Sequence, residues 1–296
     1  MPNTPTLERS AVTIETITEL ERLRTRIGTW KRAGLRVGFV PTMGNLHAGH
    51  HSLVELARGH ADRVVASVFV NPTQFGPGED FSRYPRTPGN DATGLSTAGC
   101  DALWLPSVET MYPHGVEATV QVRVPGVTET LEGEHRPGHF DGVATVVARL
   151  FNQVQPDAAV FGRKDYQQLA VIRYLARDLA FPVQIVAGET MREADGLAMS
   201  SRNQYLSADE RPRAAEIRRV LLAMRDACLA GAERAEIESA AIARLLDAGF
   251  HPDYAALRRP DLSIPGSGEG GPRVALIAAR LGRTRLIDNV DVLAID

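Results

Sequence analysis

The chain has 296 residues, of which 44% are hydrophobic and 23% charged, and its formal net charge at pH 7 is −3. This composition is typical of a globular protein with one large domain or two smaller ones, and it argues against disorder. The chain has neither a strong positive charge nor a run near the ~18 apolar residues of a membrane span, so we expect neither nucleic acid nor a membrane as a partner.

Short β-rich runs alternate with helical patterns over the first two thirds of the chain. This alternation predicts an α/β fold with a Rossmann-like, doubly wound parallel sheet and helices on both of its faces. The run 63–70 is largely apolar, as in a strand buried on both faces. We expect strands at 36–40, 63–70, 102–105, 158–161 and 183–186, helices at 16–32, 46–58, 87–99, 140–154 and 166–180, and a hairpin arm outside the main sheet at 118–124.

The pattern changes near residue 205, where a second unit is expected to begin. Ser207 and Glu210 have the spacing of a capping box at the start of a long helix. The expected elements that follow are helices ending near residues 231 and 249, strands at 254–258, 273–281 and 285–287, and a glycine-rich linker at 263–272. We therefore expect two domains, a Rossmann-like domain at 1–187 and a smaller α+β domain at 188–296.

Four loops are expected to meet at one cleft. In a doubly wound sheet, ligands bind beyond the carboxyl ends of the strands, at the point where the strand order reverses. The loops that follow expected strands or lie near their ends are 41–50, 71–80, 162–165 and 188–203. The smaller domain is expected to close over this cleft as a lid.

The N-terminus and the cysteines bear on the location of the protein. The first residues contain no basic segment followed by an apolar stretch, so we expect no secretory signal. Cys100 and Cys228 have neither the spacing of a metal site nor that of a disulfide framework. We therefore expect a reduced, cytoplasmic protein.

His47 and His50 are three residues apart at an expected helix start, with Gly49 between them. This spacing puts both rings on one face of the helix, and the free N–H groups of a helix N-terminus favour anions such as phosphate. Histidine, with an ordinary pKa of about 6.5, can serve there as a hydrogen-bond donor or as a cation. Two alternatives stay open: a pair of structural histidines that cap the helix, and a metal site, which the lack of acidic or cysteine partners at zinc-like spacing disfavours.

Five motifs in a fixed order give the chain a specific family resemblance. The stretch "PTMGNLHAGH" resembles the nucleotide-binding His-x-Gly-His signature of the class I aminoacyl-tRNA synthetase and nucleotidyltransferase superfamily. Together with "VFVNPTQF", "RYPRTP", "FGRKDYQQL" and "READGLAMSSRNQYL", it resembles the pantothenate synthetase (pantoate–β-alanine ligase) family from about residue 10 to the C-terminus. The resemblance implies ATP-dependent condensation of pantoate with β-alanine through pantoyl adenylate, with Mg²⁺, in a homodimer.

The resemblance also implies which residues contact ATP. His47, His50 and Lys164 are the implied catalytic residues, and His50 is the implied proton donor to the leaving pyrophosphate. Serine hydroxyls and an arginine fork suit phosphate oxygens. The full expected set is Met43, Gly44, His47, Gly49, His50, Gly162, Lys164, Asp165, Met191, Met199, Ser200, Ser201 and Arg202. We assign no protein ligand to the Mg²⁺ ion.

Uncharged amides and an apolar wall are expected to receive pantoate. Gln74 and Gln168 can donate to and accept from its hydroxyl and carboxylate without a competing salt bridge. Asn71 is expected to help hold the same loop. An apolar wall for the gem-dimethyl group is expected from Pro41, Met43, Val143, Val146 and Phe161, although apolar residues at helical spacing are also typical of plain core.

Some features stay without a role. Arg163 stands where the resembled family mostly has Glu or Gln, and we expect its side chain to face solvent. We assign no role to His135 and His139 in "HRPGHF".

Two alternative functions are considered. One is an adenylyltransferase that moves AMP onto a phosphorylated acceptor, against which the uncharged Gln74 and Gln168 argue. The other is a non-catalytic nucleotide-binding module. The presence of both the histidine pair and Lys164 argues against that one.

Overall fold

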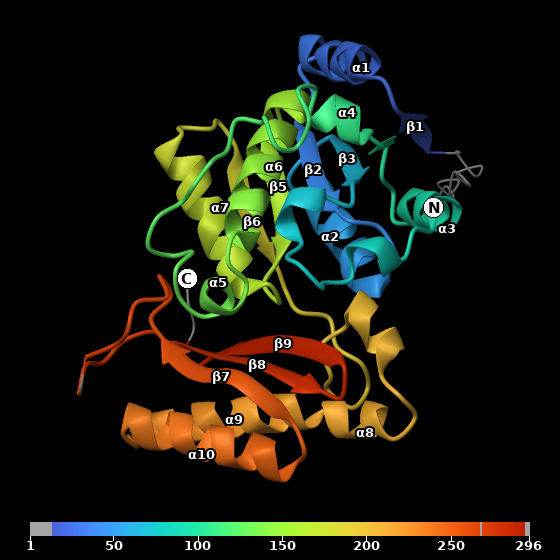
Figure 1. Cartoon of the computed structure of the whole chain (residues 1–296). Helices are drawn as coiled ribbons and strands as arrows, with labels where there is room; N and C mark the ends of the chain where they lie inside the picture. Colours follow the sequence, from blue (N-terminus) through green and yellow to red (C-terminus); the bar gives the residue numbers. More distant parts are fainter. Residues whose placement is uncertain (1–13, 267, 294–296) are drawn as a thin grey trace, which may run out of the picture.

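The computed structural model describes residues 14–266 and 268–293 and arranges them in two sheets with separate cores (Figure 1). The N-terminal stretch in which we expect no secretory signal lies outside the described residues, as does residue 267 of the expected linker. Among the residues described, no helix is both long and apolar enough to cross a membrane.

The first sheet has six strands, which are β1 (Glu15–Ile17), β2 (Val37–Thr42), β3 (Arg63–Val68), β4 (Ala102–Trp104), β5 (Ala158–Gly162) and β6 (Gln184–Gly188). All neighbours pair in parallel, in the order β1-β4-β3-β2-β5-β6. The chain builds outward from β2 to β3 and β4 and then returns to place β5 on the other side of β2. The strand order therefore reverses between β2 and β5, where ligands bind in such sheets. The prediction of a Rossmann-like, doubly wound sheet is confirmed.

Helices cover both faces of this sheet. One face carries α1 (Leu20–Arg32), α6 (His139–Val154) and α7 (Tyr166–Asp178), and the other carries α2 (Ala48–Arg58) and α3 (Pro88–Thr97). Phe39 and Phe161 belong to the core on the α6 side. Their neighbours Val40 and Val160 belong to the core on the α2 side, because consecutive strand residues point to opposite faces. This double burial explains the nearly continuous apolar runs in the sequence.

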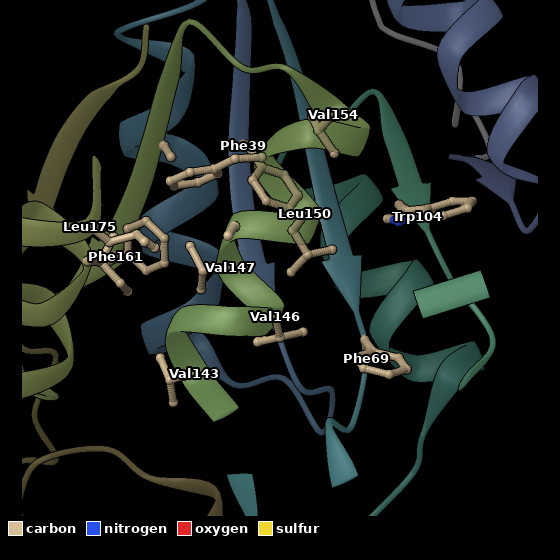
Figure 2. Packing of buried hydrophobic residues seen from close by; sticks show 14 of the residues in the cluster. Phe39, Phe69, Trp104, Val143, Val146, Val147, Leu150, Val154, Phe161 and Leu175 are labelled. Atoms are coloured by element: carbon tan, nitrogen blue, oxygen red, sulfur yellow. The ribbon is translucent and has the colours of Figure 1, made fainter. Parts of the chain in front are cut away.

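Helix α6 provides most of the core on its face. Val147 and Leu150 lie on the side of the sheet that carries Phe39 (Figure 2). The indole N–H of the fully buried Trp104 donates to Oε1 of Gln153 on α6 at 3.0 Å, so the buried polar groups are paired. The first turns of the same helix reach the carboxyl ends of the strands, which places a rigid apolar surface next to the expected cleft.

The second sheet has three antiparallel strands, β7 (His251–Arg258), β8 (Val274–Leu281) and β9 (Thr284–Asp291), in that order. It is accompanied by α8 (Glu210–Ala214), α9 (Glu216–Leu229) and α10 (Arg234–Asp247). Helices α9 and α10 cover one face of the sheet, whereas the other face is turned toward the first domain (Figure 1). There Tyr166 of α7 shares a core with Ala256 and Leu276. The predicted smaller α+β domain is confirmed.

The start of this second unit follows the sequence closely. The N–H of Ser207 donates to Oε2 of Glu210 at 2.8 Å, and the N–H of Glu210 donates to Oγ of Ser207 at 3.2 Å, as in the predicted capping box. The single long helix expected after it is instead divided at Ala215 into α8 and α9.

Two other local predictions are wrong. Residues 15–17 form the edge strand β1 and not the first turn of a helix, because Ile17 is fully buried and pairs in parallel with Trp104 of β4. Residues 118–124 form no strand. The N–H of Val122 donates to Oγ1 of Thr145 on α6 at 2.9 Å, and Val124 is buried in the first core, so this segment lies along the helix.

Candidate active site

A cleft with a volume of about 930 Å³ lies at the carboxyl ends of β2 and β5 and extends to the second sheet. It contains residues of all four expected loops. Every residue predicted to contact ATP or pantoate lines this cleft except Gly44. Those that line it are Pro41, Met43, His47, Gly49, His50, Asn71, Gln74, Val143, Val146, Phe161, Gly162, Lys164, Asp165, Gln168, Met191, Met199, Ser200, Ser201 and Arg202. Their roles in binding and catalysis stay predictions.

The turn before the two histidines is shaped by Gly44 and Asp91. Gly44 has a φ of 88°, and a Cβ there would lie 2.9 Å from Cγ1 of Val68, so this residue allows the turn and does not line the cleft. The Asp91 carboxylate, 2% exposed, accepts from the N–H groups of Asn45 at 3.1 Å and Leu46 at 2.9 Å. Sequence reasoning missed Asp91. Its signal was an acidic residue in the first turn of α3, just after the RYPRTP motif.

His47 and His50 both cap α2 and face the cleft. The N–H of Gly49 donates to Nδ1 of His47 at 3.1 Å, and the N–H of His47 donates to Nδ1 of His50 at 3.3 Å. Because both Nδ1 atoms accept, the proton of each neutral ring is assigned to Nε2. Capping and function are therefore compatible, since each ring keeps one N–H for a ligand.

Both rings are held in the neutral form near pH 7. Burial lowers the pKa of His50 to about 3, with the nearby His47 adding to the effect. Burial also lowers the pKa of His47 to about 4, and the charge of Lys164 lowers it further. Of the two roles left open by the sequence, this environment favours the hydrogen-bond donor over the cation.

The loop between β5 and α7 carries Lys164 and Asp165. Nζ of Lys164 lies 3.2 Å from Oδ1 of Asp165, and its side chain is 19% exposed. Burial opposes ionisation of Asp165, but the charges of Lys164 and Arg202 outweigh it and hold the pKa of that carboxyl below its ordinary value. Lys164 is thus kept at the cleft by an ionised neighbour that a phosphate oxygen could replace.

A small hairpin brings the Ser200–Ser201 loop to the histidine loop. The N–H of Met199 donates to the carbonyl of Met191 at 2.9 Å, so the chain folds back before Ser200. Oγ of Ser201 then donates to the carbonyl of Asn45 at 3.3 Å. A Cβ at Gly49 would lie 2.9 Å from Cε1 of His47, so the lack of a side chain there leaves room for that ring, and Met191 packs beside the same turn. Two loops far apart in the sequence therefore form one wall.

Arg202 already has an anionic partner. Its guanidinium lies 3.2 Å from Oδ1 of Asp80, and the two side chains are 33% and 18% exposed. Asp80 belongs to the loop after the 3₁₀ turn η1 (Pro72–Gln74). The Arg202 guanidinium, which is expected to bind phosphate, is therefore paired with the Asp80 carboxylate.

Asn71 and Gln74 form a buried hydrogen-bonded pair at one end of the cleft. Nδ2 of Asn71 donates to Oε1 of Gln74 at 3.0 Å and to the carbonyl of Gly142 at 3.1 Å, while its Oδ1 accepts from the Tyr112 hydroxyl at 2.5 Å. With Oε1 occupied, Gln74 presents its NH₂ group toward Sδ of Met43, at 3.1 Å, and the cleft. The geometry favours Gln74 as the group that contacts a ligand and Asn71 as the group that orients it.

Gln168 and the expected apolar residues line the other sides of this end. Val143, Val146 and Phe161 are only 2%, 6% and 4% exposed, so they serve as both core and cleft wall. The neighbouring Gln167 is used elsewhere, since its Nε2 donates to the carbonyl of Thr130 at 2.7 Å.

His139, which has no role assigned from the sequence, holds the backbone of Gln74. Its Nδ1 donates to the carbonyl of Gln74 at 2.8 Å, and its Nε2 accepts from Arg136 at 3.0 Å. Arg136 in turn pairs with Glu79 at 2.6 Å. Burial lowers the pKa of His139 to about 4, and the charge of Arg136 lowers it further. His135 lines the cleft beside Tyr254, with ring centroids 6.0 Å apart.

The buried His139 predicts acid destabilisation. Its pKa of about 4 in the folded chain lies below the ordinary 6.5, so the unfolded chain binds more protons between these values. The free energy of unfolding therefore decreases as the pH is lowered through this range. His139→Asn keeps a donor and an acceptor but does not titrate. Between pH 7 and 5, the free energy of unfolding of this variant is expected to decrease by about 2 kcal/mol less than that of the parent. Urea unfolding at both pH values measures the difference, and an unchanged pH dependence would contradict the prediction.

Arg163 does not face solvent, so that expectation is wrong. Its side chain is 19% exposed and pairs with Glu189 at 3.0 Å and with Asp291 at the end of β9. Asp291 belongs to the second sheet, so this ion pair draws the guanidinium toward the domain junction, whereas the Glu189 side chain is 81% exposed.

The profile of the pantoate–β-alanine ligase family matches residues 15–291. The chain belongs to this family. The predictions of the family and of a ligase, made from five motifs, are therefore confirmed.

Named relatives cover nearly the whole chain. The pantothenate synthetase of Xanthomonas euvesicatoria pv. vesicatoria is 67% identical over 278 residues, which is 94% of this chain and 99% of the relative. The crystal structure of pantothenate synthetase from Thermus thermophilus has a TM-score of 0.86 at 49% identity and covers 95% of this chain and 100% of that one. A pantoate–β-alanine ligase from Francisella tularensis, complexed with β,γ ATP and β-alanine, has a TM-score of 0.80 at 29% identity, with 94% and 98% of the two chains covered.

Proposed function

We propose that the protein condenses pantoate with β-alanine to pantothenate in an ATP-dependent reaction that passes through pantoyl adenylate and releases AMP and pyrophosphate. One observation carries the proposal: the two neutral histidines, Lys164 and the Ser200–Ser201 loop share a cleft with the uncharged amide of Gln74. The complex of the Francisella relative supports the choice of ATP and β-alanine.

In the first step, a carboxylate oxygen of pantoate attacks the α-phosphorus of ATP. The bond from this phosphorus to the bridging oxygen breaks, and pyrophosphate leaves with the electron pair. Both reactants are anions, so Lys164 contributes the positive charge that their approach needs. The Nε2–H groups of His47 and His50 donate to phosphate oxygens. Because its ring is neutral, His50 acts in this proposal as a hydrogen-bond donor to the leaving pyrophosphate and is not a cation.

In the second step, the amine of β-alanine attacks the acyl carbon of the adenylate. The bond from this carbon to the AMP oxygen breaks, the nitrogen loses a proton, and the amide and AMP are released. No side chain of the protein becomes covalently bonded to a substrate. The adenylate hydrolyses readily, so in this proposal the domain at 188–296 acts as a lid that excludes water.

Mg²⁺ is proposed to arrive with the triphosphate. Among residues 14–266 and 268–293, no three His, Cys, Asp or Glu side chains group as a metal cage. Mg²⁺ in such sites is held mainly by substrate phosphates, water and one or two carboxylates. Asp165, which lines the cleft beside Lys164, is the carboxylate that fits this role. When bound, the ion supplies charge neutralisation at the phosphate oxygens.

One assay separates this function from its alternatives. ATP is incubated with pantoate, β-alanine or both, and AMP and pyrophosphate are measured. AMP release that requires both acids supports the ligase. AMP transfer to a phosphorylated acceptor would support an adenylyltransferase, and ATP binding without any turnover would support a non-catalytic module.

Gln74→Ala is expected to raise the KM for pantoate about tenfold or more while the KM for ATP changes less than about twofold. The substitution removes the NH₂ group that faces the cleft, whereas the phosphate loops stay in place. Steady-state kinetics with each substrate varied in turn measure both values. Gln121→Ala is the matched control, since Gln121 is exposed and lies outside the cleft. Equal increases in the KM values for pantoate and for ATP would contradict the assignment of Gln74 to the pantoate site.

A homodimer is also proposed by analogy with the family, and a cytoplasmic location is proposed from the cysteines. Light scattering of the purified protein tests the first. The two free cysteines, Cys100 and Cys228, suit a reducing compartment.

A further inference from the structure

Asp288 and Asn289 are consecutive buried polar residues in β9, with exposed fractions of 4% and 6%. β9 is an edge strand of the second sheet, and both residues line the cleft. Buried polar groups at a domain junction need hydrogen-bond partners. The partners of these two side chains lie on the two loops proposed to bind phosphate.

Asn289 holds the backbone of the Lys164 loop. Its Nδ2 donates to the carbonyl of Arg163 at 2.9 Å and to the carbonyl of Lys164 at 2.9 Å. Both amide hydrogens are therefore used on two successive carbonyls of the other domain. This fork fixes the orientation of two peptide groups, and with them the direction in which the Lys164 side chain leaves the backbone.

Asp288 holds the hairpin that leads to the Ser200–Ser201 loop. Its carboxylate accepts from both terminal nitrogens of Arg192, at 2.7 and 3.0 Å. Arg192 also donates to the carbonyl of Gly196 at 3.0 Å, inside the same hairpin. A bidentate pair of this kind has a fixed geometry.

Strand geometry explains how neighbouring residues reach different loops. Asn289 pairs across the sheet with Leu276, which faces the first domain, and Asp288 pairs with Ile277, which faces α9. Side chains of consecutive strand residues point to opposite faces. One dipeptide of an edge strand can therefore contact the Lys164 loop on one face and the hairpin on the other.

We propose that Asn289 is a positioning residue for Lys164, so that the C-terminal domain completes the ATP site by fixing a loop of the first domain. The proposal rests on the function proposed above, in which Lys164 contacts the α-phosphate. It adds to the role of a lid: when β9 docks, it sets the geometry of the cation as well as excluding water.

The test compares Asn289→Ala and Asn289→Asp with the matched control Arg163→Gln. Asn289→Ala loses both donors, and Asn289→Asp places a carboxylate against two carbonyls. The control removes the side-chain pairing of Arg163 with β9 but keeps the carbonyl that Asn289 holds. We expect kcat/KM for ATP to fall about tenfold in Asn289→Ala and further in Asn289→Asp, with KM values for pantoate and β-alanine within about twofold of the parent. The control is expected to match the parent.

Calorimetric binding of a non-hydrolysable ATP analogue and thermal unfolding complete the test. Weaker binding of the analogue by both Asn289 variants, at temperatures where they are folded, supports the positioning role. A parent protein that binds the analogue but makes no pantothenate would overturn the proposed function and leave the positioning role standing. A lower melting temperature with unchanged ATP binding and kinetics would overturn the positioning role. Failure of the parent to bind the analogue would overturn both. If Asn289→Asp does not fold, Asn289→Ala alone decides the outcome.

Discussion

Replacement of Lys164 by alanine is expected to lower kcat for pantoate-dependent AMP formation by about a thousandfold. Lys164 is the proposed positive charge at the α-phosphorus, and its side chain lies in the cleft with both histidines. The rate of AMP release at saturating ATP and pantoate measures the effect. The fold is expected to stay intact, because the side chain is partly exposed and pairs only locally with Asp165.

The chain supplies a matched control for this experiment. Lys31 is its other lysine, on α1, where Nζ lies 3.8 Å from Oδ1 of Asp157 and outside the cleft. Lys31→Ala is expected to keep the parent rate. Normal turnover by Lys164→Ala would remove the central cation of the proposed mechanism.

His50→Ala is expected to slow adenylate formation by about a hundredfold or more, whereas His50→Gln keeps a donor near the position of Nε2 and is expected to lose less. The reason is that a neutral ring acts through its N–H. His60→Ala, at a histidine outside the cleft, serves as the control. Single-turnover release of pyrophosphate from ATP and pantoate measures the step.

The pH dependence distinguishes the neutral donor from a proton donor. The pKa of His50 is lowered to about 3, so its ring is already neutral throughout the range from about pH 5.5 to 8. The kcat/KM profile for ATP in this range is therefore expected to have the same shape in the parent and in His50→Gln. An inflection near pH 6.5 that the substitution removes would instead assign a titrating His50 to the reaction.

The sequence predicts the sheet and the cleft because the signals are local. An apolar run such as 63–70 reports burial on both faces, and the loops that follow β2 and β5 must lie at the same edge of a parallel sheet. His47, His50 and Lys164 could therefore be placed together without coordinates. The resemblance to a family then narrowed the chemistry from phosphate binding in general to one reaction.

The supporting contacts could not be predicted in this way, because each depends on a partner distant in the chain. Asp91 holds the N–H of Asn45, and Asn289 holds the carbonyl of Lys164. In each case the residue type is visible in the sequence, but its partner is set by how separate elements pack. The strand β1 could not be predicted for a related reason. Three residues are too few to show an alternation of apolar and polar side chains, and the strand is defined only by its pairing with β4.

The pair between Arg202 and Asp80 has a consequence for ligand selection. An anion that takes the place of Asp80 on this guanidinium competes with a carboxylate of the same chain, which has a high effective concentration. In the proposed ATP complex, the nucleotide also contacts the neighbouring loops, whereas a free phosphate at Arg202 would contact fewer groups. If Arg202 contacts ATP as proposed, we therefore expect the site to prefer the nucleotide over free inorganic phosphate, and Asp80 to lose its partner when ATP binds.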